Sequence, residues 1–295
     1  MDKKYIILPN KERIAYLEQG KGDNYLILIH GNFSSSLHFS TLIEQLPKDV
    51  HIIAPDLRGY GDSSYYNGID TLADFAEDVF LLTKALKIKK ANVLGWSLGG
   101  GVAMALAANH NDFVSKLILV ASTIYTGYPI FKKNEAGQPL VGQVYQTKEE
   151  MACDPVQVLP VLNMQKNKDF NMLSYIFDVT IYTGKNKPSK ENNELWINES
   201  LKQVNLIDAD FALATFNISD SDSFYGKGDG SIKNINMPVL ILAGAKDITV
   251  PNYMTDANHQ VLKKNASLKI YAESGHSPFV DCLEEIVDDI EEFIK

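Results

Sequence analysis

Arginine is nearly absent from this sequence of 295 residues, in which Arg13 and Arg58 are the only two. Lysines form no dense basic tract either, and the formal net charge is −9. Nucleic acids and anionic membrane surfaces are bound by clustered Lys and Arg, so we expect neither as a partner. A pocket that needs a bidentate arginine has very few candidate residues. The composition therefore favours a small-molecule partner.

Cysteine and long apolar runs are also scarce. Cys153 and Cys282 are the only cysteines, and their spacing fits neither a metal site nor a redox pair. Buried, unpaired thiols are typical of a reducing compartment. The apolar run in residues 1–20 is short and is interrupted by Pro9 and by charges, which predicts neither a signal peptide nor a membrane span. We expect a cytoplasmic protein with no metal and no cofactor; its oligomeric state stays open.

Apolar runs of strand length alternate with helical patterns along most of the chain. Two alternating runs in residues 1–20 predict an antiparallel hairpin. The later runs are apolar at every position, as in parallel strands that are covered on both faces. They lie at residues 25–30, 50–56, 91–96, 114–122, 237–244 and 267–274, with helical patterns at 35–46, 71–86, 98–109, 251–264 and 280–294. This order predicts a doubly wound α/β fold.

One long segment interrupts the alternation. Residues 124–235 combine short helical patches with clusters of Pro, Asn, Lys and Asp, and contain no convincing parallel strand. A segment of this length is too long for a loop in a compact domain. We therefore expect a first core part at residues 1–123, a mainly helical lid at 124–235 and a second core part at 236–295.

Gly95-Trp96-Ser97-Leu98-Gly99 matches G-x-S-x-G, with a predicted strand before it and a predicted helix after it. A serine on such a tight turn lies above the sheet edge, and glycines two residues away avoid collisions with neighbouring backbone. The helix that follows offers free N–H groups and a positive dipole to a developing negative charge. The same pentapeptide would also suit close packing alone, so its interpretation depends on partner residues.

A nucleophilic serine needs a base to take its proton, and the base needs an acid to orient it. On this kind of fold the chain order is Ser, acid, His, so the base follows Ser97. His110 follows a helix end and His259 lies within a helix, positions typical of surface residues. His276 follows a strand in a loop of Gly, Ser and Pro, which makes it the candidate base. Asp247, just beyond the end of another apolar strand, is the candidate acid.

Two backbone N–H groups are expected to stabilise an oxyanion. Leu98, the residue after the nucleophile, supplies one; Asn32, in the loop after the strand that ends near His30, supplies the other, with Phe33 as the alternative. We expect His30 to brace this loop. The candidates for an apolar substrate pocket are Phe33, Trp96, Tyr125 and Trp196, together with Tyr128, Phe131 and Phe216 of the lid, although lid aromatics can also form only the core of the lid.

Taken in order, these stretches resemble the motifs of the α/β-hydrolase superfamily. The matching stretches are HGNFSSS from His30, DLRGYGDS from Asp56, GWSLGG from Gly95, AGAKDITVP from Ala243 and SGHSPF from Ser274. The resemblance implies a mostly parallel, doubly wound sheet of eight strands with only the second strand antiparallel. It also implies a lid after the sixth strand, a catalytic triad of Ser97, Asp247 and His276, and a structural turn at DLRGYGDS.

The resemblance covers several chemistries. Relatives that dehalogenate or open epoxides carry an aspartate in place of Ser97, which disfavours both reactions. Relatives that hydrolyse C–C bonds of ring-cleavage products use an arginine near the lid, and residues 124–235 contain none. We therefore expect a carboxylesterase-like serine hydrolase that uses a small or medium acyl ester and water. The alternatives are a C–C bond hydrolase, a cofactor-free haloperoxidase or perhydrolase, and a slow-turnover ligand receptor.

Overall fold

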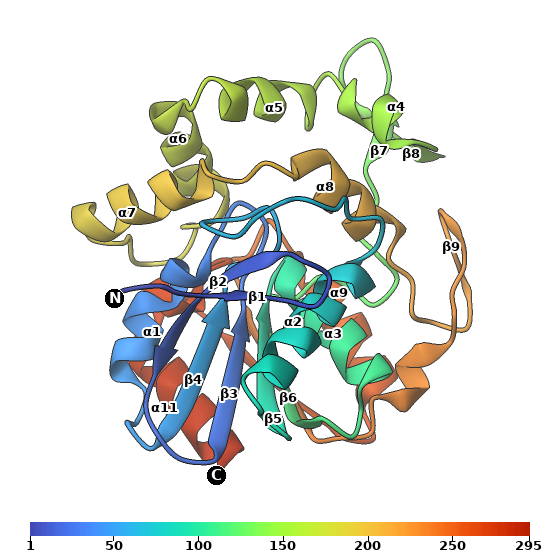
Figure 1. The fold of residues 1–295 in the computed structure, drawn as a ribbon. Coiled ribbons are helices and arrows are strands. Elements are labelled where there is room, and N and C mark those ends of the chain that lie inside the picture. The colour runs from blue at the N-terminus through green and yellow to red at the C-terminus, as the bar shows by residue number, and fades with distance from the viewer.

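A computed structural model describes all of residues 1–295. Its centre is a sheet in the strand order β1-β2-β4-β3-β5-β6-β11-β12 (Figure 1). Strand β2 is antiparallel to β1 and β4, and all other pairs are parallel, which confirms the predicted eight-stranded sheet. The strands are β1 Lys4–Ile7, β2 Arg13–Gln19, β3 Asn24–Ile29, β4 Val50–Pro55, β5 Ala91–Trp96, β6 Val114–Val120, β11 Val239–Gly244 and β12 Ala266–Tyr271.

Helices cover both faces of the sheet. Successive side chains of a strand point to opposite faces, so β3 places Ile27 and Ile29 in one core and Leu26 and Leu28 in the other. Helices α2, α3 and α9 contribute to the first core, and α1 and α11 to the second. Their bounds are α1 Ser40–Gln45, α2 Leu72–Ala85, α3 Leu98–Asn109, α9 Asn252–Leu262, α10 Pro278–Asp281 and α11 Leu283–Ile294, with a 3₁₀ helix at Ser36–Phe39 before α1.

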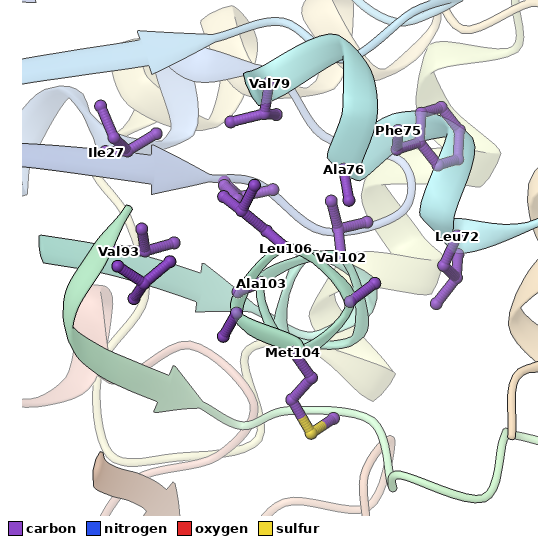
Figure 2. Close-up of a cluster of buried hydrophobic side chains, with 14 of the residues drawn as sticks. Ile27, Leu72, Phe75, Ala76, Val79, Val93, Val102, Ala103, Met104 and Leu106 are labelled. Carbon is purple, nitrogen blue, oxygen red and sulfur yellow. The ribbon is translucent and has the colours of Figure 1, made fainter. Parts of the chain in front are cut away.

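Helix α3 lies inside the first core. Figure 2 shows Val102 and Leu106 of α3 among side chains of α2 and of strands β3 and β5. Every residue from Leu98 to Ala108 is buried, as expected for a helix that is apolar all round. Its small residues allow close approach, since a Cβ on Gly101 would lie 2.6 Å from a Leu72 methyl carbon. The core therefore fixes the helix that begins at the predicted nucleophile.

In Figure 1, helices α4 to α8 of the segment between β6 and β11 lie above the sheet, and β9 lies to its side. The segment contains five α-helices, a 3₁₀ helix at Ser231–Asn234 and two short antiparallel hairpins, which the lid prediction did not anticipate. Hairpin strands pair only with each other, so they leave the central sheet unchanged. The elements are β7 Phe131–Lys133, β8 Pro139–Val144, α4 Lys148–Ala152, α5 Leu159–Lys166, α6 Phe170–Thr180, α7 Lys190–Ser200, α8 Leu206–Thr215, β9 Asp222–Ser223 and β10 Gly226–Lys227.

An ion cluster attaches this segment to the core. The carboxylates of Asp56, Asp62 and Glu199 lie close enough to share a metal ion, but the Lys3 ammonium lies among them at 2.7, 3.0 and 2.6 Å. Burial opposes the charge of Lys3, yet the attraction of Asp56 and Glu199 outweighs it and raises the pKa of Lys3. Because Glu199 belongs to α7, Lys3 connects the amino terminus to the lid. None of the helices combines the length and apolar character that crossing a membrane requires.

Candidate active site

Ser97 occupies a strained turn between β5 and α3. Its backbone angles, φ 56° and ψ −122°, lie outside the ordinary helical and strand regions. The N–H of Ser97 donates to Val120, and its carbonyl oxygen accepts from Gly100 and Thr123, so hydrogen bonds on both sides hold the turn. A strained conformation persists only where surrounding structure fixes it, and such positions cluster at active sites.

The glycines around this turn are required by close backbone contacts. A Cβ on Gly95 would overlap the carbonyl oxygen of Gly99, and a Cβ on Gly99 would overlap that of Ile29. On the opposite side, a Cβ on Gly31 would lie 2.9 Å from the Ser97 Cβ. The loop after β3 therefore lies directly against the serine.

Ser97, His276 and Asp247 form one continuous hydrogen-bonded chain. The Ser97 hydroxyl lies 2.9 Å from His276 Nε2, and His276 Nδ1 lies 2.8 Å from Asp247 Oδ2. A carboxylate only accepts, so Nδ1 carries the proton and Nε2 is free to accept the serine proton. The His276 and Asp247 side chains are 2% and 0% exposed. Burial of this pair shields it from solvent and strengthens its electrostatic interaction.

Backbone donors fix the orientation of Asp247. Its Oδ1 accepts from the N–H groups of Thr249 at 2.9 Å and Val250 at 2.8 Å, which leaves Oδ2 for His276. The other downstream histidines lie elsewhere. His110 pairs with Glu77 at 2.9 Å on the surface, and His259 lies on α9 without a hydrogen bond to Ser97 or Asp247. Of the three candidate bases, the structure brings only His276 to Ser97.

The expected oxyanion donors lie beside the serine. The N–H of Leu98 is in the first turn of α3, and neither it nor the N–H of Asn32 donates a hydrogen bond within the protein. The N–H of Phe33, the alternative donor, is engaged by Gln203 Oε1 at 3.1 Å. This arrangement leaves Asn32 and Leu98 as the free pair, and their role at an oxyanion stays a prediction.

His30 braces the loop that carries Asn32. Its Nδ1–H donates to the Gly31 carbonyl oxygen at 2.8 Å, and Nε2 accepts from the Leu57 N–H at 3.0 Å. Burial lowers the pKa of His30 to about 4, so the ring is neutral and keeps this pair of bonds near neutral pH. The loop is therefore connected to the turn after β4 through one side chain.

A cavity of about 520 Å³ opens onto Ser97 and His276. No lysine or arginine lines it, and 14 of the 22 lining residues are hydrophobic. Phe33, Trp96 and Tyr128, three of the predicted pocket residues, lie in its wall. The remaining lining residues are Asn32, Leu98, Thr123, Ile130, Val156, Gln157, Val161, Leu173, Ile176, Phe177, Thr180, Ile181, Asp210, Leu213, Ile248, Thr249 and Val250.

Four other predicted pocket residues lie outside this cavity, which corrects the prediction. Trp196 packs in the core of the lid and its indole N–H lies 3.4 Å from Ser40 Oγ. Tyr125 and Phe216 pack against the first core of the sheet. Phe131 packs edge-on against another lid aromatic, Phe224. Aromatic side chains were needed to build the lid itself, and sequence offered no means to separate these from the ones that face the cavity.

Asp210 is a cavity residue that the sequence patterns did not predict. This residue lies on α8 in the cavity wall, and one carboxylate oxygen accepts from Asn32 Nδ2 at 2.8 Å. Burial raises the pKa of Asp210 to about 7, although the bond from Asn32 opposes the rise. The sequence feature that could have indicated Asp210 is an acid between Ala209 and the apolar run from Phe211 to Ala214. The helix there otherwise needs an apolar face.

The reversed second strand, the serine turn and the chain order of Ser97, Asp247 and His276 together define the α/β-hydrolase class. Residues 24–281 match the family described as alpha/beta hydrolase fold, and the chain belongs to this family. It is 29% identical to the pimeloyl-[acyl-carrier protein] methyl ester esterase of Vibrio atlanticus over 88% of this chain and 90% of that protein. It is 34% identical to human serine hydrolase BPHL over 39% of this chain and 42% of that protein.

A solved structure repeats the fold. An esterase from Exiguobacterium antarcticum superposes with a TM-score of 0.75 at 23% identity, over 99% of each chain. At this identity the likeness concerns the fold alone. The family match and the similarity to the methyl ester esterase describe an esterase-like α/β hydrolase.

Proposed function

We propose that this protein is a serine esterase that hydrolyses small or medium acyl esters through an acyl-enzyme on Ser97. The observation that carries the proposal is the chain from Ser97 through His276 to Asp247, which opens into the cavity. A methyl ester esterase among the relatives supports the same bond type. Catalytic roles follow from this geometry.

In the first half of the reaction, Ser97 Oγ attacks the ester carbonyl carbon as its proton passes to His276 Nε2. The charge that develops on the carbonyl oxygen is met by the N–H groups of Asn32 and Leu98, each of which contributes about 3 kcal/mol to lowering the barrier. Collapse of the tetrahedral intermediate breaks the ester C–O bond, and His276 gives its proton to the departing alcohol. Asp247 stabilises the imidazolium throughout.

In the second half, water attacks the acyl-enzyme. His276 takes a proton from the water, a second tetrahedral intermediate forms against the same two N–H groups, and its collapse returns the proton to Ser97 and releases the acid. The volume of the cavity supports an acyl group of small or medium size. Its wall has no lysine or arginine for a dienoate carboxylate, so we retain ester hydrolysis over C–C bond hydrolysis.

A fluorophosphonate probe and short p-nitrophenyl esters test this proposal. The wild type should be labelled and should turn the esters over, and Ser97→Ala should lose labelling and about 10⁴-fold of the activity. His276→Ala should lose comparable activity, whereas His259→Ala, a histidine outside the site, should retain it. Absence of both labelling and turnover in the folded wild type, or loss of activity in His259→Ala alone, would contradict the proposal.

A further inference from the structure

One carboxylate oxygen in the cavity has no partner. Asp210 Oδ1 accepts from Asn32, but no group of the protein donates to Oδ2. Most other polar side chains of the wall are already engaged: Tyr128 donates to the Thr249 carbonyl and Thr249 to that of Thr180. The cavity therefore presents an acidic group that is free to bind a ligand.

A chain of hydrogen bonds through Gln203 fixes which side-chain atom of Asn32 faces Asp210. The Phe33 N–H only donates, so the side-chain oxygen of Gln203 must face it, and Gln203 Nε2 then donates to Asn32 Oδ1 at 2.8 Å. Tyr60 donates to the same oxygen at 2.9 Å. Asn32 must consequently turn Nδ2 toward Asp210. The carboxylate is held from one side by a rigid neutral donor, and its second oxygen is left for the cavity.

The charge of this carboxylate is not compensated within the protein. No lysine or arginine lines the cavity, and burial raises the pKa of Asp210 to about 7 with only the Asn32 hydrogen bond in opposition. A half-buried carboxylate without a counter-charge is costly, and a cation that enters the same cavity reduces that cost. Anionic substrates would meet repulsion instead.

We propose that Asp210 is a specificity-determining residue that binds a protonated amine of the substrate, so that preferred substrates are esters bearing an ammonium group. An ammonium supplies several donors and a full positive charge, and its hydrogen bond to the free oxygen of Asp210 is charge-assisted. Asn32 joins this group to the reaction centre, since Asn32 follows Gly31, which packs against Ser97. This inference rests on the proposed esterase function.

Matched pairs of esters that differ by a protonated nitrogen against a carbon measure the effect. Ethyl 3-aminopropanoate against ethyl butanoate places the charge on the acyl side, and 2-(dimethylamino)ethyl butanoate against 3-methylbutyl butanoate places it on the alcohol side. In one of the pairs the wild type should favour the amine in kcat/KM by about tenfold or more. Asp210→Asn, which keeps the shape and a hydrogen-bonding group, should lose this preference, so that the amine ester and the neutral ester of that pair are hydrolysed with similar kcat/KM.

A control variant separates binding of the amine by Asp210 from an effect of the protein's net charge. Asp178→Asn removes the same charge from an exposed ion pair of the lid, with Lys187, and should leave the preference unchanged. Equal preference in the wild type and Asp210→Asn would overturn the inference. A uniform loss on all four esters would also overturn it, because Asp210 would then only position Asn32.

Binding without turnover keeps this inference distinguishable from the proposed function. Calorimetry with the Ser97→Ala variant should show binding of the preferred amine ester, and the double variant with Asp210→Asn should bind it about tenfold more weakly. Failure of the wild type to hydrolyse any ester would refute the esterase proposal, whereas equal binding by the two variants would refute the role of Asp210.

The pH dependence of the preference is a further readout. Asp210 loses its charge as the pH falls through about 7, so the ratio of kcat/KM for amine over neutral ester should fall over the same range. The titratable groups that share its surroundings are Tyr60 and Tyr128, whose pKa values burial raises above the ordinary value, and His276 of the cavity. Any change at the catalytic triad alters the turnover of both esters alike and cancels in the ratio. A ratio independent of pH would contradict a charged Asp210 at the amine.

Discussion

The indole Nε1 of Trp96 donates a hydrogen bond to the backbone carbonyl oxygen of His276 at 2.9 Å. The residue that precedes the nucleophile on β5 thus holds the loop of the base, 180 positions further along the chain. The same tryptophan ring lines the cavity. Its position explains how a loop after β12 can present His276 at a constant distance from Ser97.

Trp96→Phe should therefore impair both catalysis and stability. Phenylalanine keeps a ring in place but leaves the His276 carbonyl without its donor, at a cost of about 1–2 kcal/mol in the free energy of unfolding. We expect kcat with a short p-nitrophenyl ester to fall about tenfold, as for a small misplacement of a base. Steady-state kinetics and urea denaturation measure the two effects.

The second tryptophan provides the control. Trp196 lies in the lid core and outside the cavity, and its indole N–H makes only a long hydrogen bond of 3.4 Å, to Ser40 Oγ. Trp196→Phe should alter stability and leave kcat within about twofold. If the two variants lose kcat equally, then the Trp96 hydrogen bond does not position the base.

Local patterns in the sequence were sufficient for the core of this fold. The helix expected at residues 98–109 is α3, Leu98–Asn109, and the runs apolar at every position became parallel strands because both faces of the sheet are covered. Chain order and strand ends also predicted the site, because Ser97, Asp247 and His276 each lie at or just beyond the end of an apolar run, in the order that the fold requires. The predictions of the core elements and of the triad both rest on short-range sequence patterns and on the strand order of a single fold.

Prediction failed where side-chain direction depends on tertiary packing. Tyr125 and Trp196 are aromatic, as many pocket residues are. In the structure, however, Tyr125 packs against the first core of the sheet and Trp196 packs inside the lid. Asp210 was missed because the direction in which α8 faces depends on contacts with α2 and α4, which a single sequence does not reveal. Relative orientation of helices in an inserted segment is set by these distant contacts.

The serine turn should tolerate no side chain at Gly99. A Cβ there would overlap the carbonyl oxygens of Ile29 and His30, which are backbone atoms that cannot rotate away. We expect Gly99→Ala to lower the free energy of unfolding by about 1–3 kcal/mol, as for other overpacked sites. Gly68→Ala is the matched control, since nothing lies near its Cβ position. Urea denaturation that shows equal stability for the two variants would contradict the close-packed turn.

Loss of Lys3 should destabilise the junction between core and lid. The Lys3 side chain is 5% exposed, and its removal leaves Asp56, Asp62 and Glu199 close together with less compensation. We expect Lys3→Met to cost about 3 kcal/mol in the free energy of unfolding. Lys4→Met breaks a pair whose lysine is 58% exposed and should cost less than about 1 kcal/mol. Equal unfolding midpoints for the two variants would show that the cluster contributes nothing.

Asp210 should make stability depend on pH in a direction opposite to that of most carboxyl groups. Burial raises its pKa in the folded protein from 3.8 to about 7, so the folded state binds more protons than the unfolded state between these values. The stabilisation is complete below pH 3.8 and is lost as the pH rises through about 7.

Asp210→Asn removes this titration, so its stability relative to the wild type should increase between about pH 5 and about pH 8.5. Because the group faces an open cavity, we expect a gain of about 1–2 kcal/mol after solvent screening. Urea denaturation of both proteins at the two pH values measures the difference, in which all other titrations cancel. Asp178→Asn, on the exposed surface of the lid, should show no such change. A difference between Asp210→Asn and the wild type that stays constant with pH would mean that the carboxyl group titrates as it does in water, and that the cavity imposes no cost on its charge.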